Sequence, residues 1–471
     1  MTSTPGLAGR GTPVAGRAGL EVRNWGTDLF SRPAAVVEAR CVDDIVAVLK
    51  DAERYPAPVR AIGSGHSTTR CQEADGGTVV RMRGMNRILA ITADTVSAEA
   101  GAQLIDVAKA LQQRQLQLFV NIELGNATLG SVACCATKDA SMPGEYGQLN
   151  SYCVGMKLVT PSGEIVEITE DDPELLQLAR SSYGLFGIVY ETTFRVRPLQ
   201  AMSVEHEVYD VAEFKEKLPA LVERGQSMMF YIFPFLNRIA VEFREYTGDA
   251  GTRRPGPNRF VWRLRNKVWK SVGPGFGYVA QRFIPLPALR FFLVDRFNGI
   301  LQLTTRVLKS SYTLPTDQMI RYPDMSNWTR YTFSIWAFPA ESYADTLVEY
   351  CAFAQDYYRR VGWRVNMIHV GYRILHDQSS LFSYSWDGDV MTIDPVSTGA
   401  PGWREFLHAY NEFCSQHGGT PLLNQSWGLT REQVERAFGE RVARFEQARR
   451  NFDPGDRLLN PYFRELLEAP A

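Results

Sequence analysis

Short β-branched runs alternate with amphipathic helical stretches between residues 23 and 198. Residues 43–55 open on two aspartates, which favour a helix start, and residues 103–113 carry apolar side chains at helical spacing. The Thr-Pro-Ser-Gly segment at 160–163 predicts a hairpin turn. Strands are predicted at residues 36–40, 59–62, 78–81, 88–91, 96–99, 157–159, 164–168 and 188–196. The pattern predicts an α+β fold with many short strands and no regular βαβ ladder.

The chain changes in character after Pro198. Residues 253–309 hold twelve Lys and Arg against one acid, Asp295, which leaves a net charge of +11. A second α+β body is predicted from residue 313 to 419, followed by one helix at 431–450 and a final segment at 452–467. We therefore expect a disordered tail at 1–21, a first domain at 22–200, a second domain at 201–440 that includes the insertion 253–309, and a C-terminal segment at 441–471 that returns to the first domain.

Composition excludes several classes of protein. The 471 residues carry 51 Lys+Arg and 52 Asp+Glu, a net charge of −1, so no global surface for nucleic acid is expected. No apolar run is long enough to cross a bilayer, and residues 1–19 lack the apolar core of a signal peptide. The seven cysteines form no CxxC pair, which favours reduced thiols and a cytoplasmic location.

Three segments rich in small residues carry candidate chemistry. Residues 63–67 (Gly-Ser-Gly-His-Ser) follow a predicted strand, and their glycines allow a tight turn whose backbone N–H groups attract an anion. Residues 124–137 allow close packing against a flat ligand, and Thr128 is placed to cap a helix. Residues 182–189 put glycine before a strand. A structural turn or a tightly packed helix would explain each segment taken alone.

Together and in this order, the three segments resemble the FAD-binding domain of the vanillyl-alcohol-oxidase (PCMH-type) flavoprotein family, most closely its aldonolactone and alditol oxidase branch. Asn24-Trp25-Gly26 and Asn460-Pro461-Tyr462 match that branch as well. The resemblance covers residues 22–200 and the tail, and it is weak in between. It implies a two-part PCMH-type FAD-binding domain plus an α+β substrate (cap) domain with an antiparallel sheet.

The resemblance also implies where FAD binds. The loop at 63–67 would wrap the pyrophosphate, and His66 would be joined covalently to the flavin 8α-methyl group. Backbone groups at 188–189 would contact the adenine or its ribose, and the tail would return to the flavin edge. The implied cofactor-binding residues are Gly63, Ser64, Gly65, His66, Ser67, Thr128, Gly130, Ser131, Cys134, Ile188, Val189, Asn460 and Tyr462.

Two further groups of residues have a less specific interpretation. Cys134 and Cys135 are adjacent, and buried small hydrophobes are favoured over a redox pair or a flavin link. No metal site is predicted, because Asp387-Gly388-Asp389 suits a hairpin turn and His369 and His376 lack a third ligand.

The substrate half departs from the branch. Its Glu-x-Arg motif, which faces the flavin, corresponds here to Gly371-Tyr372-Arg373, and Gln425 stands where the branch has lysine. With both charges missing, a polyhydroxylated substrate is in doubt and a more apolar cavity is expected. The candidate catalytic residues are Arg373, Gln425 and Tyr322. The alternative for Arg373 is a structural ion pair with Asp377 or Asp394.

The basic insertion has two interpretations. On a helix, Arg259, Arg263, Lys267 and Lys270 share one face, opposite the apolar face that carries Trp262 and Trp269. This arrangement suits an anionic membrane surface or a lid. A helix packed on the core with a solvated charged face is the alternative.

The resemblance predicts an FAD-dependent oxidoreductase, an oxidase or a dehydrogenase, that takes hydride from a C–H bond next to oxygen on an alcohol, lactone or sugar-like substrate. The expected partners are a small-molecule substrate and O2 or another electron acceptor, with no nucleic acid. Two alternatives remain: a flavin-dependent reductase or dehydrogenase for a lipid-like substrate at a membrane surface, and a flavin-binding protein without turnover. The expected location is cytoplasmic, with possible peripheral contact to the membrane.

Overall fold

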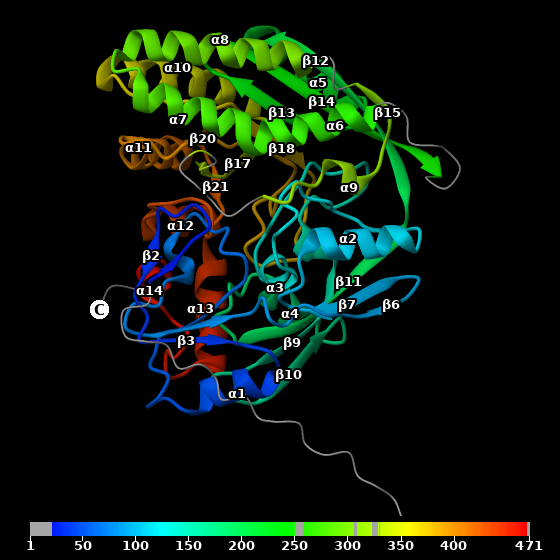
Figure 1. Ribbon diagram of the computed structural model, residues 1–471, viewed down its shortest axis with the longest axis vertical. Helices are drawn as coiled ribbons and strands as arrows, with labels where there is room; N and C mark the ends of the chain where they lie inside the picture. Colours follow the sequence, from blue (N-terminus) through cyan, green and yellow to red (C-terminus); the bar gives the residue numbers. More distant parts are fainter. Residues whose placement is uncertain (1–20, 250–257, 306–308, 323–327, 329, 469–471) are drawn as a thin grey trace, which may run out of the picture.

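Two bodies stack on each other in the structure, a computed structural model that describes residues 21–249, 258–305, 309–322, 328 and 330–468 (Figure 1). Most of the first two hundred residues form one body, and the other contains the large antiparallel sheet with its helices (Figure 1). The predicted tail lies almost entirely outside the described residues.

Two sheets form the first body. The smaller sheet is parallel, in the order β3-β5-β4, and the valines of its three strands are buried. The larger sheet is antiparallel, in the order β10-β9-β11-β7-β6, and β8 also pairs with β11. The strands are β3 (Ala35–Glu38), β4 (Val59–Ile62), β5 (Thr78–Arg81), β6 (Ile88–Ile91), β7 (Thr95–Glu99), β8 (Leu116–Leu118), β9 (Cys153–Val159), β10 (Ile165–Thr169) and β11 (Ile188–Pro198).

Short helices join these strands. They are α1 (Val42–Lys50), α2 (Leu104–Gln113), α3 (Leu129–Cys134) and α4 (Pro173–Ala179), with 3-10 turns at Arg70–Gln72 and Leu149–Tyr152. The hairpin predicted at 160–163 joins β9 to β10, where Gly163 adopts a φ of 83°. The first predicted helix ends at Lys50, several residues earlier than expected. A small outer sheet pairs β1 (Val22–Arg23) with β2 (Phe30–Ser31).

The second body is built on an eight-stranded sheet in the order β15-β12-β14-β13-β18-β19-β17-β21. Its strands are β12 (Gln200–Asp210), β13 (Ser227–Phe233), β14 (Arg238–Asp249), β15 (Ser310–Thr313), β17 (Trp336–Pro339), β18 (His369–Ile374), β19 (Val390–Ile393) and β21 (Thr420–Pro421). Every pairing is antiparallel, which confirms the predicted α+β fold with an antiparallel cap sheet. A separate pair joins β16 (Thr332–Phe333) to β20 (Val396–Ser397).

Helices cover the two faces of this sheet differently. On one face, Phe230 of β13 packs against Phe214 of α5 (Val211–Glu223) and Tyr343 of α10 (Tyr343–Val361). On the other face, Met229 and Tyr231 pack with Trp269 and Leu301 from the basic insertion. Alternation along β13 therefore separates a closed core from a face that is turned toward the first body. Further helices are α9 (Pro315–Gln318) and α11 (Trp403–Gln416).

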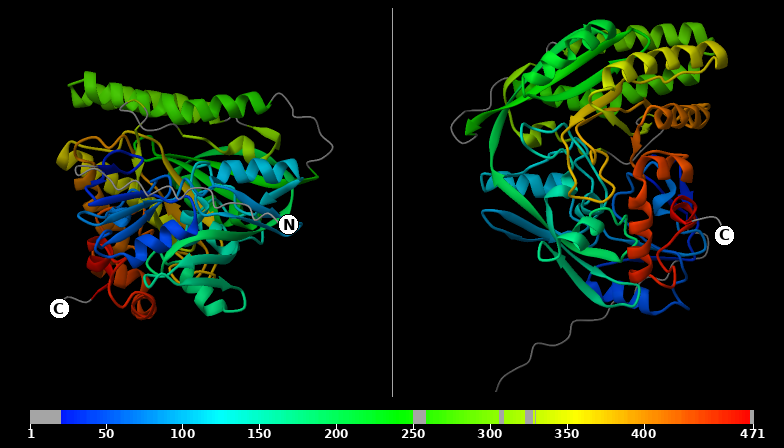
Figure 2. Two further views of the ribbon diagram at one scale, coloured as in Figure 1. Left: turned by 60° about the horizontal axis from the view of Figure 1, so that its bottom comes forward. Right: turned by 180° about the vertical axis from the view of Figure 1, so that it is seen from behind.

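The basic insertion forms a helical layer over that second face. It contains α6 (Asn258–Lys267), a π-helical turn (Val268–Val272), α7 (Gly273–Phe283) and α8 (Pro287–Thr305). Both figures show α8 at the end of the molecule farthest from the first body (Figures 1 and 2). No helix among the described residues is both long and apolar enough to cross a membrane.

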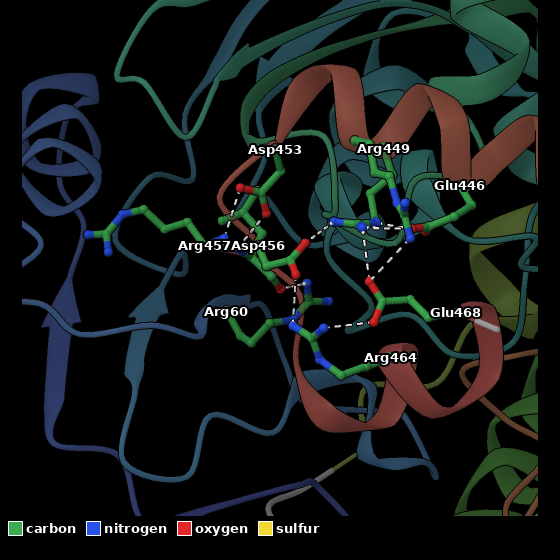
Figure 3. A network of polar contacts seen from close by, with 10 residues as sticks. Arg60, Glu446, Arg449, Asp453, Asp456, Arg457, Arg464 and Glu468 are labelled. Carbon is green, nitrogen blue, oxygen red and sulfur yellow. Dashed lines mark hydrogen bonds and ion pairs between the residues drawn. The ribbon is translucent and has the colours of Figure 1, made fainter. Parts of the chain in front are cut away.

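The C-terminal helices α12 (Arg431–Phe438), α13 (Glu440–Phe452) and α14 (Pro461–Leu467) return to the first body. The single helix predicted at 431–450 is wrong, because Gly439 breaks it with a φ of 54° and a ψ of −135°. Arg449 forms ion pairs with Glu446, Asp456 and Glu468 (Figure 3).

The tail is fastened to β4 by its backbone. The Val59 N–H donates to the Arg457 carbonyl at 2.8 Å, and the Arg60 guanidinium donates to the Leu458 carbonyl at 3.0 Å. Arg60 also donates to Tyr183 at 2.6 Å, so one buried side chain joins three distant segments. The segment that follows β4 is therefore positioned by residues from the far end of the chain.

Candidate active site

Two adjoining cavities lie between the bodies. The first, here called the cofactor cleft, has a volume of about 1010 Å³ and is lined by residues 60–67, by α3 with its flanks, and by 183–189. The second, here called the substrate cavity, has a volume of about 1220 Å³. Leu124, Thr137 and Gln425 line both. The two cavities therefore meet at a shared wall.

The glycine-rich loop is shaped by contacts that exclude larger side chains. Gly65 has a φ of 69°, a conformation that favours glycine. A Cβ atom on Gly63 would lie 2.0 Å from the Thr128 hydroxyl oxygen. Thr128 precedes α3 as predicted, but its hydroxyl shares a hydrogen bond with Ser131 (2.9 Å) and does not cap the helix backbone.

We expect Gly63→Ala to lower the flavin content of the purified protein. The added methyl group must displace Thr128 or the loop, and overpacking of this kind costs about 1–3 kcal/mol. FAD binding should weaken about tenfold or more. The ratio of flavin to protein absorbance measures this. Gly455→Ala is the matched control, because no atom lies within 4 Å of its added Cβ; equal flavin content in both variants would contradict the prediction.

His66 lies in the cofactor cleft without a polar partner. Both ring nitrogens are buried, and neither has a hydrogen-bond partner among the described residues. The ring contacts Trp25, with centroids 4.6 Å apart. Burial, assisted by the charge of Arg83 and opposed by the nearby Asn126 side chain, lowers the pKa of His66 to about 3. The imidazole is therefore neutral at physiological pH, and its ring nitrogens can react with or bond to a ligand in the cleft.

Other predicted cofactor residues divide into two groups. The cleft is lined by Gly63, Ser64, Gly65, His66, Ser67, Thr128, Gly130, Ser131, Cys134 and Val189. The remaining three lie outside its lining. Ile188 is turned into the core of the first body, opposite to Val189. Asn460 donates to the backbone carbonyls of Arg70 and Glu73, both at 3.0 Å, and the Tyr462 hydroxyl donates to the Leu423 carbonyl at 2.5 Å.

Asn460 and Tyr462 thus brace the segments around the cleft instead of lining it.

The adjacent cysteines behave as small hydrophobes. Both are free thiols, and burial raises the pKa of Cys134 to about 11 and that of Cys135 well above its usual range. Neither thiol is ionised at neutral pH, so the structure gives no support to a redox pair.

The substrate cavity is predominantly apolar. Side chains from the first body, the cap sheet and the basic insertion all contribute, and α8 and the π-helical turn close one side. Its apolar and aromatic lining consists of Ile122, Leu124, Met229, Trp269, Phe297, Leu301, Tyr322, Tyr331, Phe333, Ile335, Met367, Ile368, Val370, Tyr372, Val396 and Leu422.

The three candidate catalytic residues have different positions. Tyr322 lines the cavity and donates its hydroxyl hydrogen to Glu123 at 2.6 Å. Gln425 lies at the shared wall, where its side-chain oxygen accepts from the Thr68 hydroxyl at 3.0 Å. Arg373 does not line the cavity; it forms an ion pair of 2.8 Å with Asp389. Arg373 is therefore in an ion pair outside the cavity, as the alternative interpretation expects, but its partner is Asp389 and not Asp377 or Asp394.

Strand alternation explains why Arg373 lies elsewhere. Val370 and Tyr372 of β18 face the substrate cavity, so Gly371 and Arg373 point to the opposite face of the sheet. Gly371 packs against Phe230, where an added Cβ atom would lie 2.3 Å from the Thr392 carbonyl oxygen. The cavity face of this strand is accordingly uncharged.

Two ion pairs in the cavity wall, one buried and one partly exposed, were not predicted. Lys138 and Asp394 approach to 2.6 Å, and Glu123 pairs with Arg265, also at 2.6 Å. No short motif marks these residues, because each pair joins segments far apart in the chain.

The contacts of α6 show whether its apolar face is free to meet a membrane. Trp262 is 2% exposed and Trp269 lines the substrate cavity, so the apolar face of α6 packs on the protein. Arg265, on the same side, is buried against Glu123. The apolar face of α6 is therefore not open to a bilayer, whereas its charged face, with Arg263 and Lys267, is exposed to solvent. The side chain of Arg259 lies outside the described residues.

Comparison with known proteins shows the family to which this chain belongs. Residues 33–169 match a family described as FAD binding domain, and residues 192–466 match the family described as D-arabinono-1,4-lactone oxidase. The chain belongs to the D-arabinono-1,4-lactone oxidase family. The protein is therefore an FAD-dependent oxidoreductase, as the resemblance predicted.

Curated relatives and solved structures span nearly the whole chain. L-gulono-1,4-lactone dehydrogenase of Mycobacterium tuberculosis is 24% identical, covering 94% of this chain and 98% of its own. L-gulonolactone oxidase of Bos taurus is 23% identical, covering 96% and 99%. Cholesterol oxidase of Brevibacterium sterolicum superposes with a TM-score of 0.74 at 16% identity over 98% of this chain and 100% of that one. This likeness confirms the predicted fold.

Proposed function

We propose that the enzyme oxidises a hydroxyl-bearing carbon of a largely apolar molecule, with FAD held in the cofactor cleft as the hydride acceptor. The observation that carries this proposal is the junction of the two cavities, where Leu124, Thr137 and Gln425 border both. FAD supplies the two-electron redox chemistry when bound. The protein has to orient the substrate, exclude water and accept the hydroxyl proton.

Tyr322 and Gln425 would orient the substrate at this junction. Burial and the nearby Glu123 carboxylate raise the pKa of Tyr322 well above its usual value, so its phenol stays protonated. Arg265 holds Glu123 from the other side. Tyr322 therefore keeps a fixed hydroxyl in a wall that is otherwise mainly apolar, and Gln425 offers an amide next to the cleft.

A sugar lactone is the second candidate substrate, because the named activities of the curated relatives concern such lactones. The lining favours an apolar substrate in this chain, because most of its residues are apolar or aromatic and its charged groups, Glu123, Lys138 and Asp394, are held in ion pairs. The electron acceptor, O2 or another acceptor, is a separate question that oxygen consumption during turnover answers.

An anaerobic panel tests the substrate class. Cyclohexanol, benzyl alcohol and 1-octanol should bleach the flavin absorbance, whereas xylitol, sorbitol and L-gulono-1,4-lactone should be poor substrates. Turnover of the polar compounds at rates typical of enzymes, about 1–1000 per second, would favour the lactone. Flavin that no compound reduces would favour a flavin-binding protein without turnover, and bleaching by a reduced nicotinamide alone would favour the reductase.

We also propose that FAD is attached covalently through His66. The support is the position of a neutral imidazole in the cofactor cleft, where neither ring nitrogen makes a hydrogen bond of good geometry among the described residues. A bond from one ring nitrogen to the flavin 8α carbon would release two protons and two electrons, which pass to O2 or another acceptor.

A peripheral membrane location is the last part of the proposal. Six large apolar side chains are 48–65% exposed on α8, on its connection to α7 and at the end of α7. We call them the docking patch: Phe283, Leu286, Leu289, Phe292, Ile300 and Leu303. Exposed Arg282 and Arg296 lie among them in the sequence. Apolar groups bordered by cations suit an anionic bilayer at the cytoplasmic face.

The position of the docking patch also supports this location. The opposite side of α8 contributes Phe297 and Leu301 to the substrate cavity. One helix therefore separates the apolar cavity from the docking patch. An apolar substrate dissolved in a membrane at this patch would lie close to the cavity.

A further inference from the structure

Lys138 and Asp394 form the most deeply buried ion pair of the substrate cavity. Lys138 Nζ lies 2.6 Å from Asp394 Oδ2, and the two side chains are 4% and 2% exposed. Lys138 comes from the first body, three residues after Cys135, and Asp394 follows β19 of the cap sheet. Burying two charges is costly, and such a pair does not by itself stabilise a fold.

The backbone around Asp394 is fixed. Its N–H donates to the Val370 carbonyl at 2.7 Å, and its carbonyl accepts from the Val370 N–H at 3.1 Å. The ammonium group of Lys138 also lies 4.1 Å from the centre of the Tyr372 ring. Both charged groups are therefore held in place before any ligand enters.

One carboxylate oxygen of the pair is left without a partner. Asp394 Oδ1 is buried and accepts no hydrogen bond within the described part of the chain. The other carboxylate in the lining, Glu123, is fully engaged, since its two oxygens accept from Tyr322 and Arg265. A buried acceptor without a partner calls for an explanation, and Asp394 Oδ1 is the one such atom among the described residues that line the substrate cavity.

We propose that Asp394 is the catalytic base of the oxidation and that Lys138 holds it in place as its counter-ion. A substrate hydroxyl would donate to Oδ1. As the carbon loses hydride to FAD, the O–H bond breaks, its electron pair forms the second bond of the carbonyl, and the proton passes to Oδ1. The substrate loses two electrons and two hydrogens, FAD gains the hydride, and Asp394 later releases the proton to solvent. This inference rests on the proposed function.

The surroundings of Asp394 favour this role. Burial raises the pKa of Asp394 to about 6, although Lys138 and the hydroxyl of the neighbouring Thr392 oppose the shift, and this brings the pKa closer to the optimum for a general base. The other titratable groups that face it are Tyr372 of β18, Tyr343 of α10, Tyr384, and Tyr410 and Cys414 of α11. Burial raises the pKa of each of these well above its usual value, so Lys138 is the charged group among them.

The test is anaerobic reduction of the flavin, followed by stopped-flow absorbance from pH 5 to pH 9, with cyclohexanol, benzyl alcohol and L-gulono-1,4-lactone as probes. We expect Asp394→Asn to slow reduction by a hundredfold or more, as loss of a general base does. The wild-type rate should fall as the pH drops through about 6, and the variant should lose this dependence.

Two further variants keep the result interpretable. Asp389→Asn removes a carboxylate that pairs with Arg373 outside the cavity lining, and it should retain the wild-type rate and pH profile. Lys138→Met/Asp394→Asn removes both charges together, so no unpaired charge is left buried. This double variant should fold and bind FAD even if Asp394→Asn alone unfolds, and its flavin should still be reduced slowly.

Two outcomes would overturn the inference and are distinguishable from each other. A rate for Asp394→Asn within about threefold of wild type, with an unchanged pH profile, would make the pair a structural link between the bodies. Wild-type flavin that no probe reduces would remove the proposed function itself, and this inference with it.

Discussion

Acid-denatured wild-type protein is expected to retain its flavin on the polypeptide, and His66→Ala is expected to release all of it. His66 lies in the cofactor cleft as a neutral base, with a pKa lowered to about 3 by burial and with both ring nitrogens unpaired. The variant should still bind FAD without a covalent bond, since the loop supplies backbone N–H groups, and its flavin reduction potential should be lower. Precipitation followed by absorbance of the pellet and the supernatant measures the first effect.

Ser64→Ala is the matched control for this experiment. The Ser64 hydroxyl is also buried in the loop without a partner, so its removal changes the polarity of the cleft but not the attachment point. Its flavin should stay in the pellet. Complete release of free FAD from the wild type would contradict the covalent bond and leave the fold and the cofactor unaffected.

Vesicles of anionic lipid should sediment with the wild-type protein at low salt, and a variant with reversed charges should stay in solution. The charges to reverse are those of Arg263, Lys267, Arg282 and Arg296, all of them exposed. Each contributes on the order of 1 kcal/mol near an anionic surface, so loss of four corresponds to roughly a thousandfold weaker binding. High salt should weaken the wild-type interaction.

A second variant separates the apolar part of this interaction from the charged part. Phe283→Ser/Leu286→Ser/Phe292→Ser removes half of the docking patch without changing any charge, and it should weaken binding at both salt concentrations. Lys215→Glu/Lys217→Glu, on α5, is the control for charge alone. Equal and salt-insensitive sedimentation of all variants, or none with any lipid, would reject a membrane role for the docking patch.

The cofactor loop was predictable because its information is local. A strand that runs into Gly-Ser-Gly-His-Ser specifies both the turn and the chemistry over a few residues, and the structure places all five in the cofactor cleft. The antiparallel cap sheet and the joining of the tail to the first body follow from the family resemblance. Elements with their own start and stop signals, such as the hairpin at 160–163, were found for the same reason.

Arg373 could not be placed from its neighbours in the sequence. A strand presents alternate residues to opposite faces of its sheet. A change of register by one residue therefore exchanges the side chains that face the ligand with those that face away. Val370 and Tyr372 face the cavity because Phe230 and Gly371 pack together on the other side of the sheet. That choice depends on the packing of α5 and α10, which no local pattern encodes.

Lys138 and Asp394 were missed for a different reason. They are 256 positions apart, and they meet because the two bodies stack on each other. The same holds for Glu123 and Arg265, which lie on a first-body loop and on α6. Sequence patterns describe each body, but a site between bodies depends on how they dock.

The attachment of the tail has a consequence for how the protein is made. Val59 and Arg60, just before the cofactor loop, are held by the carbonyl groups of Arg457 and Leu458, and Asn460 holds the segment just after the loop. On the ribosome residues 457–460 emerge long after the loop that they hold. The cofactor loop lacks these contacts until they have been synthesised, so we expect FAD to bind stably only after that point. A chain that ends before residue 457 should yield a colourless protein, although nearly all of the cofactor cleft would have been synthesised.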